Sequence, residues 1–110
     1  INNIPLVLAT YPQPWQAHPQ ASPRVRGWLG VSENTIHTED RPFQIIEAFV
    51  RHHGIAYVNV TPSFRDYPQT TRLYFQDDFH FTPKGHAVYA DTLGRFLRNA
   101  FDEDTFGRMK

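Results

Sequence analysis

Hydrophobic positions along the chain follow first a strand pattern and then a helical one, which predicts an α/β unit. Residues 5–10 and 55–60 are short, continuous apolar runs, typical of parallel strands buried on both faces. Between them, Asp40 and Pro42 are typical of a helix start, and Gly54 is typical of a helix end. The apolar positions at helical spacing are Phe43, Ile46, Phe49, Val50 and His53. A strand, a helix and a strand in this order predict half of a doubly wound parallel sheet.

The pattern predicts one more helix near the end of the chain. Thr82 is a suitable N-cap and Pro83 suits the first helical position, so we expect a helix that begins there. Its expected buried stripe is Ala90, Leu93, Leu97, Ala100 and Phe101. The segment 12–41 has several prolines and little periodicity, so it is interpreted as a long loop or insertion. In a compact domain such a segment is usually functional, or else it contains a short element that the pattern does not place. Residues 102–110 are expected to form a polar tail.

Composition narrows the classes of function. The chain has 110 residues with 11 basic and 11 acidic side chains, which argues against a nucleic-acid partner because such proteins show a basic excess. No apolar run approaches the roughly 20 residues that a membrane span needs. The chain contains no cysteine, which excludes thiolate metal sites and cysteine nucleophiles. We expect neither a cofactor nor a resident metal.

The candidate chemistry lies just before the last helix. Asp77 and His80 are three positions apart, a spacing that lets the Asp77 carboxylate reach Nδ1 of His80 and leave Nε2 as a general base. A helix N-terminus disfavours the imidazolium form, and Asp77 would offset this effect. The adjacent Asp78 is the alternative carboxylate. An ordinary solvated turn remains an alternative interpretation of the same spacing.

Further candidates come from the loops. Tyr11, Gln13 and Trp15 follow the carboxyl end of the first predicted strand, where open α/β sheets bind ligands, so they are candidate substrate-binding residues. Trp15 could equally pack beneath the long loop. His86 is a candidate pocket or metal residue, with local packing as its alternative. The candidate nucleophiles in the chain are Ser22, Ser32 and Ser63. The segment Gly30-Val-Ser32-Glu-Asn34 approaches the Gly-x-Ser-x-Gly motif, but Ser32 lacks the strand before it and the helix after it that mark a nucleophile, so a polar loop residue is the favoured interpretation.

One block of residues resembles a known family. The pattern Asp77-x-x-His80-x-Thr82-x-x-Gly85-His86 resembles the last block of the SGNH/GDSL hydrolase superfamily. The resemblance implies a three-layer, flavodoxin-like α/β fold in which helices flank a parallel sheet. It also implies a serine esterase or acyltransferase, with His80 as general base and Asp77 as its orienting acid. The implied substrates are small-molecule or carbohydrate esters, including O-acyl groups on sugars.

The family's nucleophile and oxyanion residues are not in this sequence. Neither its Gly-Asp-Ser block nor its Gly-x-Asn block occurs in residues 1–110, and the chain begins at Ile1 with its methionine at Met109. We therefore expect residues 1–110 to be the C-terminal portion of one hydrolase-like domain, and inactive alone. Two alternatives stay open: a metal-dependent hydrolase that uses Asp77, Asp78, His80 and His86, and a non-catalytic α/β interaction module.

Overall fold

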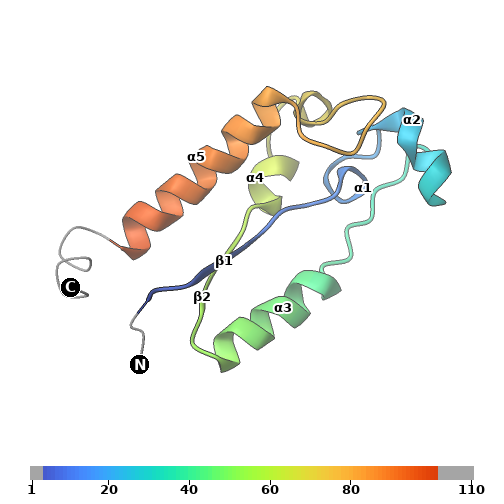
Figure 1. The fold of residues 1–110 in the computed structure, drawn as a ribbon. Coiled ribbons are helices and arrows are strands. Elements are labelled where there is room, and N and C mark those ends of the chain that lie inside the picture. Colours follow the sequence, from blue (N-terminus) through green and yellow to red (C-terminus); the bar gives the residue numbers. More distant parts are fainter. Residues whose placement is uncertain (1–3, 102–110) are drawn as a thin grey trace.

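Two short parallel strands run through the middle of the molecule (Figure 1). The computed structural model describes residues 4–101, and the predicted tail 102–110 lies outside them. Strand β1 is Val7–Thr10 and strand β2 is Ala56–Asn59, paired in register from Val7 with Ala56 to Thr10 with Asn59. The expected α/β class and the parallel pairing are confirmed, in the form of a small two-stranded sheet with helices.

Helix α3, Arg41–His52, connects the two strands and lies on the opposite side of them from the last helix (Figure 1). Gly54 has φ +64 and ends the helix region in the left-handed conformation, as predicted. Asp40 stands at the N-cap position, but its carboxylate accepts a hydrogen bond from Arg65 at 3.1 Å instead of capping the helix. Phe43 and Val50 are the residues that α3 buries.

The segment 12–41 is not the continuous loop that its composition indicated. It contains α1 at Pro14–Ala17, α2 at Pro23–Arg26 and the 3-10 helix η1 at Gly27–Leu29. Pro14 and Pro23 each begin a helix, where a missing N–H has no cost. Elements of three or four residues are too short to show periodicity, which is why the hydrophobic pattern did not reveal them.

The second half of the chain forms two short helices and then one long helix. Its elements are α4 at Thr61–Arg65, η2 at Thr70–Leu73 and α5 at Pro83–Ala100. The Thr82 hydroxyl accepts a hydrogen bond from the Gly85 N–H at 3.2 Å, so the predicted cap is confirmed. Between η2 and α5, an antiparallel bridge from Tyr74 to Phe81 closes a narrow loop. This loop carries the candidate acid and histidine.

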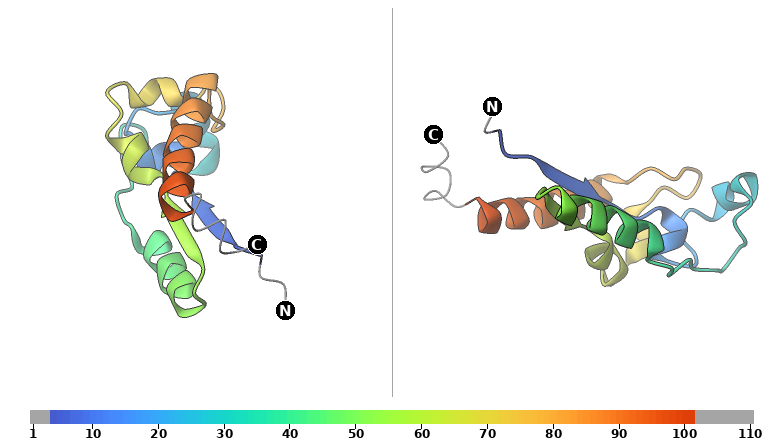
Figure 2. Two further views of the ribbon diagram at one scale, coloured as in Figure 1. Left: turned by 90° about the vertical axis from the view of Figure 1, so that its left-hand side faces the viewer. Right: turned by 90° about the horizontal axis from the view of Figure 1, so that it is seen from below.

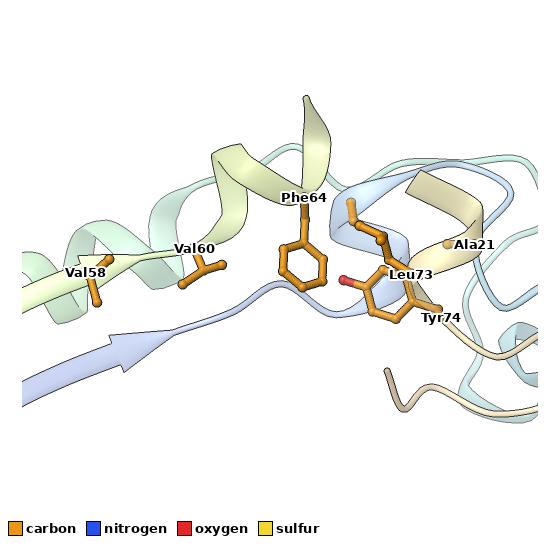
Figure 3. Close-up of a cluster of buried hydrophobic side chains, with 7 residues drawn as sticks. Ala21, Val58, Val60, Phe64, Leu73 and Tyr74 are labelled. Atoms are coloured by element: carbon orange, nitrogen blue, oxygen red, sulfur yellow. The ribbon is translucent and has the colours of Figure 1, made fainter. Parts of the chain in front are cut away.

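The hydrophobic core runs from the strands to the segments beyond their carboxyl ends. Its buried members are Ala17, Ala21, Val58, Val60, Phe64, Leu73 and Tyr74. Figure 3 shows the rings of Phe64 and Tyr74 between the end of β2 and the turn of η2. Helix α5 packs on this cluster through Val88, Tyr89, Leu93 and Phe96. The core therefore supports the candidate site directly.

The molecule is elongated, as the views in Figure 2 show. Its extents are 49 × 27 × 21 Å and its radius of gyration is 16.2 Å, against about 13 Å for a compact domain of about this length. None of the helices among residues 4–101 is both long and apolar enough to cross a membrane.

Candidate active site

The loop between Tyr74 and Phe81 is anchored at its base from both sides. The buried Tyr74 hydroxyl donates to the Pro12 carbonyl oxygen at 2.8 Å, which ties the loop to the segment after β1. The Phe75 N–H donates to the His80 carbonyl at 3.1 Å, and the Thr82 N–H donates to the Leu73 carbonyl at 2.9 Å. The loop is thus held closed where it joins the core.

Gly85 sets how closely α5 approaches this base. A Cβ atom at position 85 would lie 2.2 Å from the backbone carbonyl oxygen of Leu73, so only glycine permits the observed contact. Thr82 also donates its hydroxyl to the Arg72 carbonyl at 2.6 Å. The first turn of α5 therefore docks on η2. This turn carries His86 and directly follows the loop that carries His80.

The His80 ring is held by a carboxylate and by an aromatic ring. Its Nδ1 is in contact with Oδ1 of Asp78, which also accepts a hydrogen bond from the His80 backbone N–H at 2.9 Å. The ring of Phe79 stacks on the imidazole with centroids 4.5 Å apart. A carboxylate at Nδ1 favours the tautomer that carries the proton there and leaves Nε2 as an acceptor.

The structure does not form the expected contact between Asp77 and His80. The Asp77 carboxylate instead accepts a hydrogen bond from the Arg24 guanidinium at 2.7 Å. Consecutive side chains point in different directions, so Asp77 and Asp78 cannot both face the imidazole. Asp78, the alternative carboxylate in the sequence, takes the position predicted for Asp77.

Hydrogen bonds from His80 also tune Asp78 electrostatically. The backbone N–H of His80, and secondarily its side chain, hold the pKa of Asp78 below its usual value despite partial desolvation. Asp78 is consequently ionised at neutral pH. An ionised carboxylate at Nδ1 stabilises the imidazolium that forms when Nε2 accepts a proton.

A pocket of about 360 Å³ opens beside His80. Its lining consists mostly of aromatic side chains and imidazoles: Tyr11, Gln13, Phe79, His80, Phe81, His86 and Tyr89. The structure thus brings two of the three predicted substrate-binding residues, Tyr11 and Gln13, to the histidine. Trp15 lies elsewhere, in a hollow that it shares with His37, whose N–H donates to the Trp15 carbonyl at 2.7 Å.

Several lining residues were not among the residues predicted to bind substrate. Phe79 and Phe81 flank His80 in the sequence, and Tyr89 stands one helical turn after His86, so a helical repeat from His86 points to it. The rings of Tyr11, Phe81 and Tyr89 form a cluster, with the Tyr11 and Phe81 centroids 5.1 Å apart. His86 packs edge-on against Phe81 with ring centroids 5.4 Å apart, and it also lines the pocket.

None of the protein-family models, curated proteins and solved structures compared with this chain matches it. The chemistry of the site is therefore argued from its geometry. Within residues 4–101, no group of three or more histidine and acidic side chains is arranged to hold a metal ion. Asp77 is engaged with Arg24, so the four-residue metal site considered from the sequence is not assembled.

Proposed function

We propose that this chain supplies the histidine base and its orienting carboxylate to a serine esterase of the SGNH/GDSL type. The observation that carries the proposal is the contact between Asp78 and His80 beside the aromatic pocket. An imidazole held in this way can take a proton from a serine hydroxyl and return it to the leaving alcohol. The proposed substrates are carboxylic esters, O-acyl groups on carbohydrate among them.

The geometry favours Asp78 as the orienting carboxylate, whereas the family spacing favours Asp77. Asp78 touches Nδ1, and its side chain is 48% exposed. Asp77 is 71% exposed and paired with Arg24. We therefore assign the orienting role to Asp78 and treat Asp77 as the alternative.

The nucleophile is proposed to come from outside these 110 residues. None of the chain's serines lines the pocket beside His80, and the Ser22 hydroxyl is hydrogen-bonded to the carbonyls of Phe75 and Asp78. Ser63 lies on α4, in the wall of a different hollow. A Gly-Asp-Ser block in another segment of the protein would complete the reaction.

The same proposal extends the sheet beyond β1 into a three-layer, flavodoxin-like fold. Within residues 4–101, β1 pairs with β2 on one edge only, and parallel sheets are stable when further strands and helices cover them. Just before it, Ile4 and Leu6 are 77% and 63% exposed, which is unusual for apolar residues that lead into a parallel strand. Helices that cover the faces of a larger sheet would bury these side chains.

The test uses the protein expressed from its complete coding sequence. Hydrolysis of p-nitrophenyl acetate and labelling by a fluorophosphonate are measured for the wild type and for His80→Ala, Asp78→Asn and Asp77→Asn. We expect His80→Ala and Asp78→Asn to lower kcat by about 10³-fold or more, as loss of a triad member does. Asp77→Asn should lower kcat less than about tenfold, because an exposed ion pair contributes little.

Each contrary outcome has a definite meaning. Absence of both hydrolysis and labelling in the wild type would contradict the esterase proposal and favour the non-catalytic module. A large loss in Asp77→Asn with none in Asp78→Asn would return the orienting role to Asp77. Activity that disappears with a chelator and returns with added metal would favour the metal-dependent hydrolase.

A further inference from the structure

We infer that Ser22 is a positioning residue for the loop that carries Asp78 and His80, a role that rests on the proposed esterase function. Ser22 lies in the segment 12–41, far from that loop in the sequence. Its hydroxyl nevertheless contacts the loop directly, through hydrogen bonds to Phe75 and Asp78 that span 53 and 56 positions.

The Ser22 hydroxyl contacts the loop at both Phe75 and Asp78. It lies 2.8 Å from the Phe75 carbonyl oxygen and 2.7 Å from the Asp78 carbonyl oxygen, and a hydroxyl has one proton that these two acceptors must share. Ser22 is 2% exposed, so the donor side of these contacts is shielded from water. The carboxylate that touches His80 therefore belongs to a residue whose backbone is held by Ser22.

Arg24 adds two weaker contacts to the same loop. Its backbone N–H donates to the Gln76 carbonyl at 3.1 Å, and its guanidinium pairs with Asp77 at 2.7 Å. Both partners of the ion pair are about 70% exposed, which makes it weak because solvent screens it. We therefore assign the positioning role to the buried Ser22 rather than to Arg24.

The backbone at Ser22 supports this assignment. Ser22 has φ 49 and ψ 55, in the left-handed region that side chains other than glycine, asparagine and aspartate seldom adopt. Glycine would adopt this conformation without strain but would supply no hydroxyl. A strained residue whose side chain fastens a catalytic loop is the arrangement expected where strain serves function.

Ser22 does not fit the alternative role of nucleophile. A nucleophilic serine must donate its proton to the histidine, whereas the Ser22 hydroxyl donates to backbone carbonyls and is almost fully buried. The two roles make different predictions. Loss of a nucleophile abolishes labelling, whereas a shift of the base by about 1 Å slows the reaction by up to about 100-fold.

The experiment compares Ser22→Ala and Ser22→Gly with a matched control, Ser63→Ala, in the complete protein. Both Ser22 variants lose the hydroxyl, and the glycine variant also relieves the backbone strain. We expect kcat for p-nitrophenyl acetate to fall about 10- to 100-fold in both, with KM within about threefold and fluorophosphonate labelling slowed but retained. Ser63→Ala should behave as the wild type does. Ser22→Cys, with its weaker donor, should fall between wild type and alanine.

A second measurement reads the position of the loop without activity. The ¹⁵N NMR spectrum of the His80 ring reports which nitrogen carries the proton. We expect the Nδ1–H tautomer in the wild type and a mixture in Ser22→Ala, with circular dichroism confirming that the variant is folded. The tautomer of His80 would change in Ser22→Ala even if the protein proved not to be an esterase. The measurement therefore tests the positioning role of Ser22 separately from the esterase proposal. An unchanged tautomer with unchanged kcat in folded Ser22→Ala would overturn the inference, as would complete loss of labelling.

Discussion

Arg26 illustrates how one buried side chain organises a segment with little regular structure. It is 1% exposed, and its guanidinium donates to backbone carbonyls of His18, Ala21, Ser32 and Thr35 at 2.6 to 3.2 Å. Burial lowers its pKa from the usual value. Because the planar guanidinium has several donors in a fixed arrangement, it can satisfy acceptors that no other side chain could reach together. The segment that holds Ser22 therefore depends on Arg26.

We expect Arg26→Lys to lower the free energy of unfolding by about 2–3 kcal/mol. The ammonium group cannot reach all these carbonyls, and buried acceptors left without a partner are costly. Arg24→Met is the matched control, since it removes an exposed arginine with one ion pair and should change the free energy by less than about 1 kcal/mol. Urea denaturation measures both variants, and equal effects would contradict a special role for Arg26.

At two residues, the sequence correctly predicted where a helix begins or ends. Thr82 caps a helix and Gly54 ends one, because each acts within a single turn of its own backbone. The contact that selects Asp78 is also local, but it is shorter in sequence than the spacing used for the prediction. The Asp78 carboxylate accepts from the His80 backbone N–H and touches Nδ1, two positions away, whereas Asp77 pairs with Arg24, 53 positions away.

At the scale of elements, α5 shows how far periodicity alone can place a buried face. The expected stripe included Leu93, which packs on the core, but also Ala90 and Leu97, which are exposed. The observed face instead runs through Val88, Tyr89, Leu93 and Phe96. Docking of Gly85 on Leu73 decides the rotation of the helix, and no periodic pattern contains that contact.

The two glycines of α5 should respond oppositely to substitution. Gly85→Ala places a methyl group against the Leu73 carbonyl, so we expect a loss of about 1–3 kcal/mol in the free energy of unfolding. At Gly94 an added Cβ meets only the flexible end of Arg98 at 3.4 Å, so Gly94→Ala should gain about 0.5–1 kcal/mol from helix propensity. Thermal and urea unfolding test the pair, and a destabilised Gly94→Ala would indicate close packing there.

The molecule is extended around a two-stranded sheet, and in the part of the chain that the structure describes one edge of β1 has no partner strand. Its radius of gyration of 16.2 Å and the exposed Ile4 and Leu6 fit a surface that other structure covers. The core that extends beyond the carboxyl ends of the strands supports the site, and Val7 and Ala9 of β1 pack against it.

Hydrogen exchange tests the longer sheet. In the complete protein, we expect the β1 amides that do not bond to β2 to be protected about as strongly as those that do, because a further strand would accept from them. Exchange at the rate of exposed loops would contradict this and would show β1 to be a true edge. The β2 amides provide the internal reference.

The sequence by itself determined the strand–helix–strand order, the parallel class, the Thr82 cap of α5, the glycine that ends the α3 region and the loop in which the acid and the histidine lie. These features follow from side chains that act on their own backbone or on neighbours within a turn. Tertiary structure alone decided that Asp77 pairs with Arg24, that Tyr11 and Gln13 but not Trp15 join the pocket, and that the Ser22 hydroxyl bonds to the loop. Those outcomes depend on contacts between distant segments, where packing and hydrogen-bond geometry select one arrangement from several that local patterns allow equally.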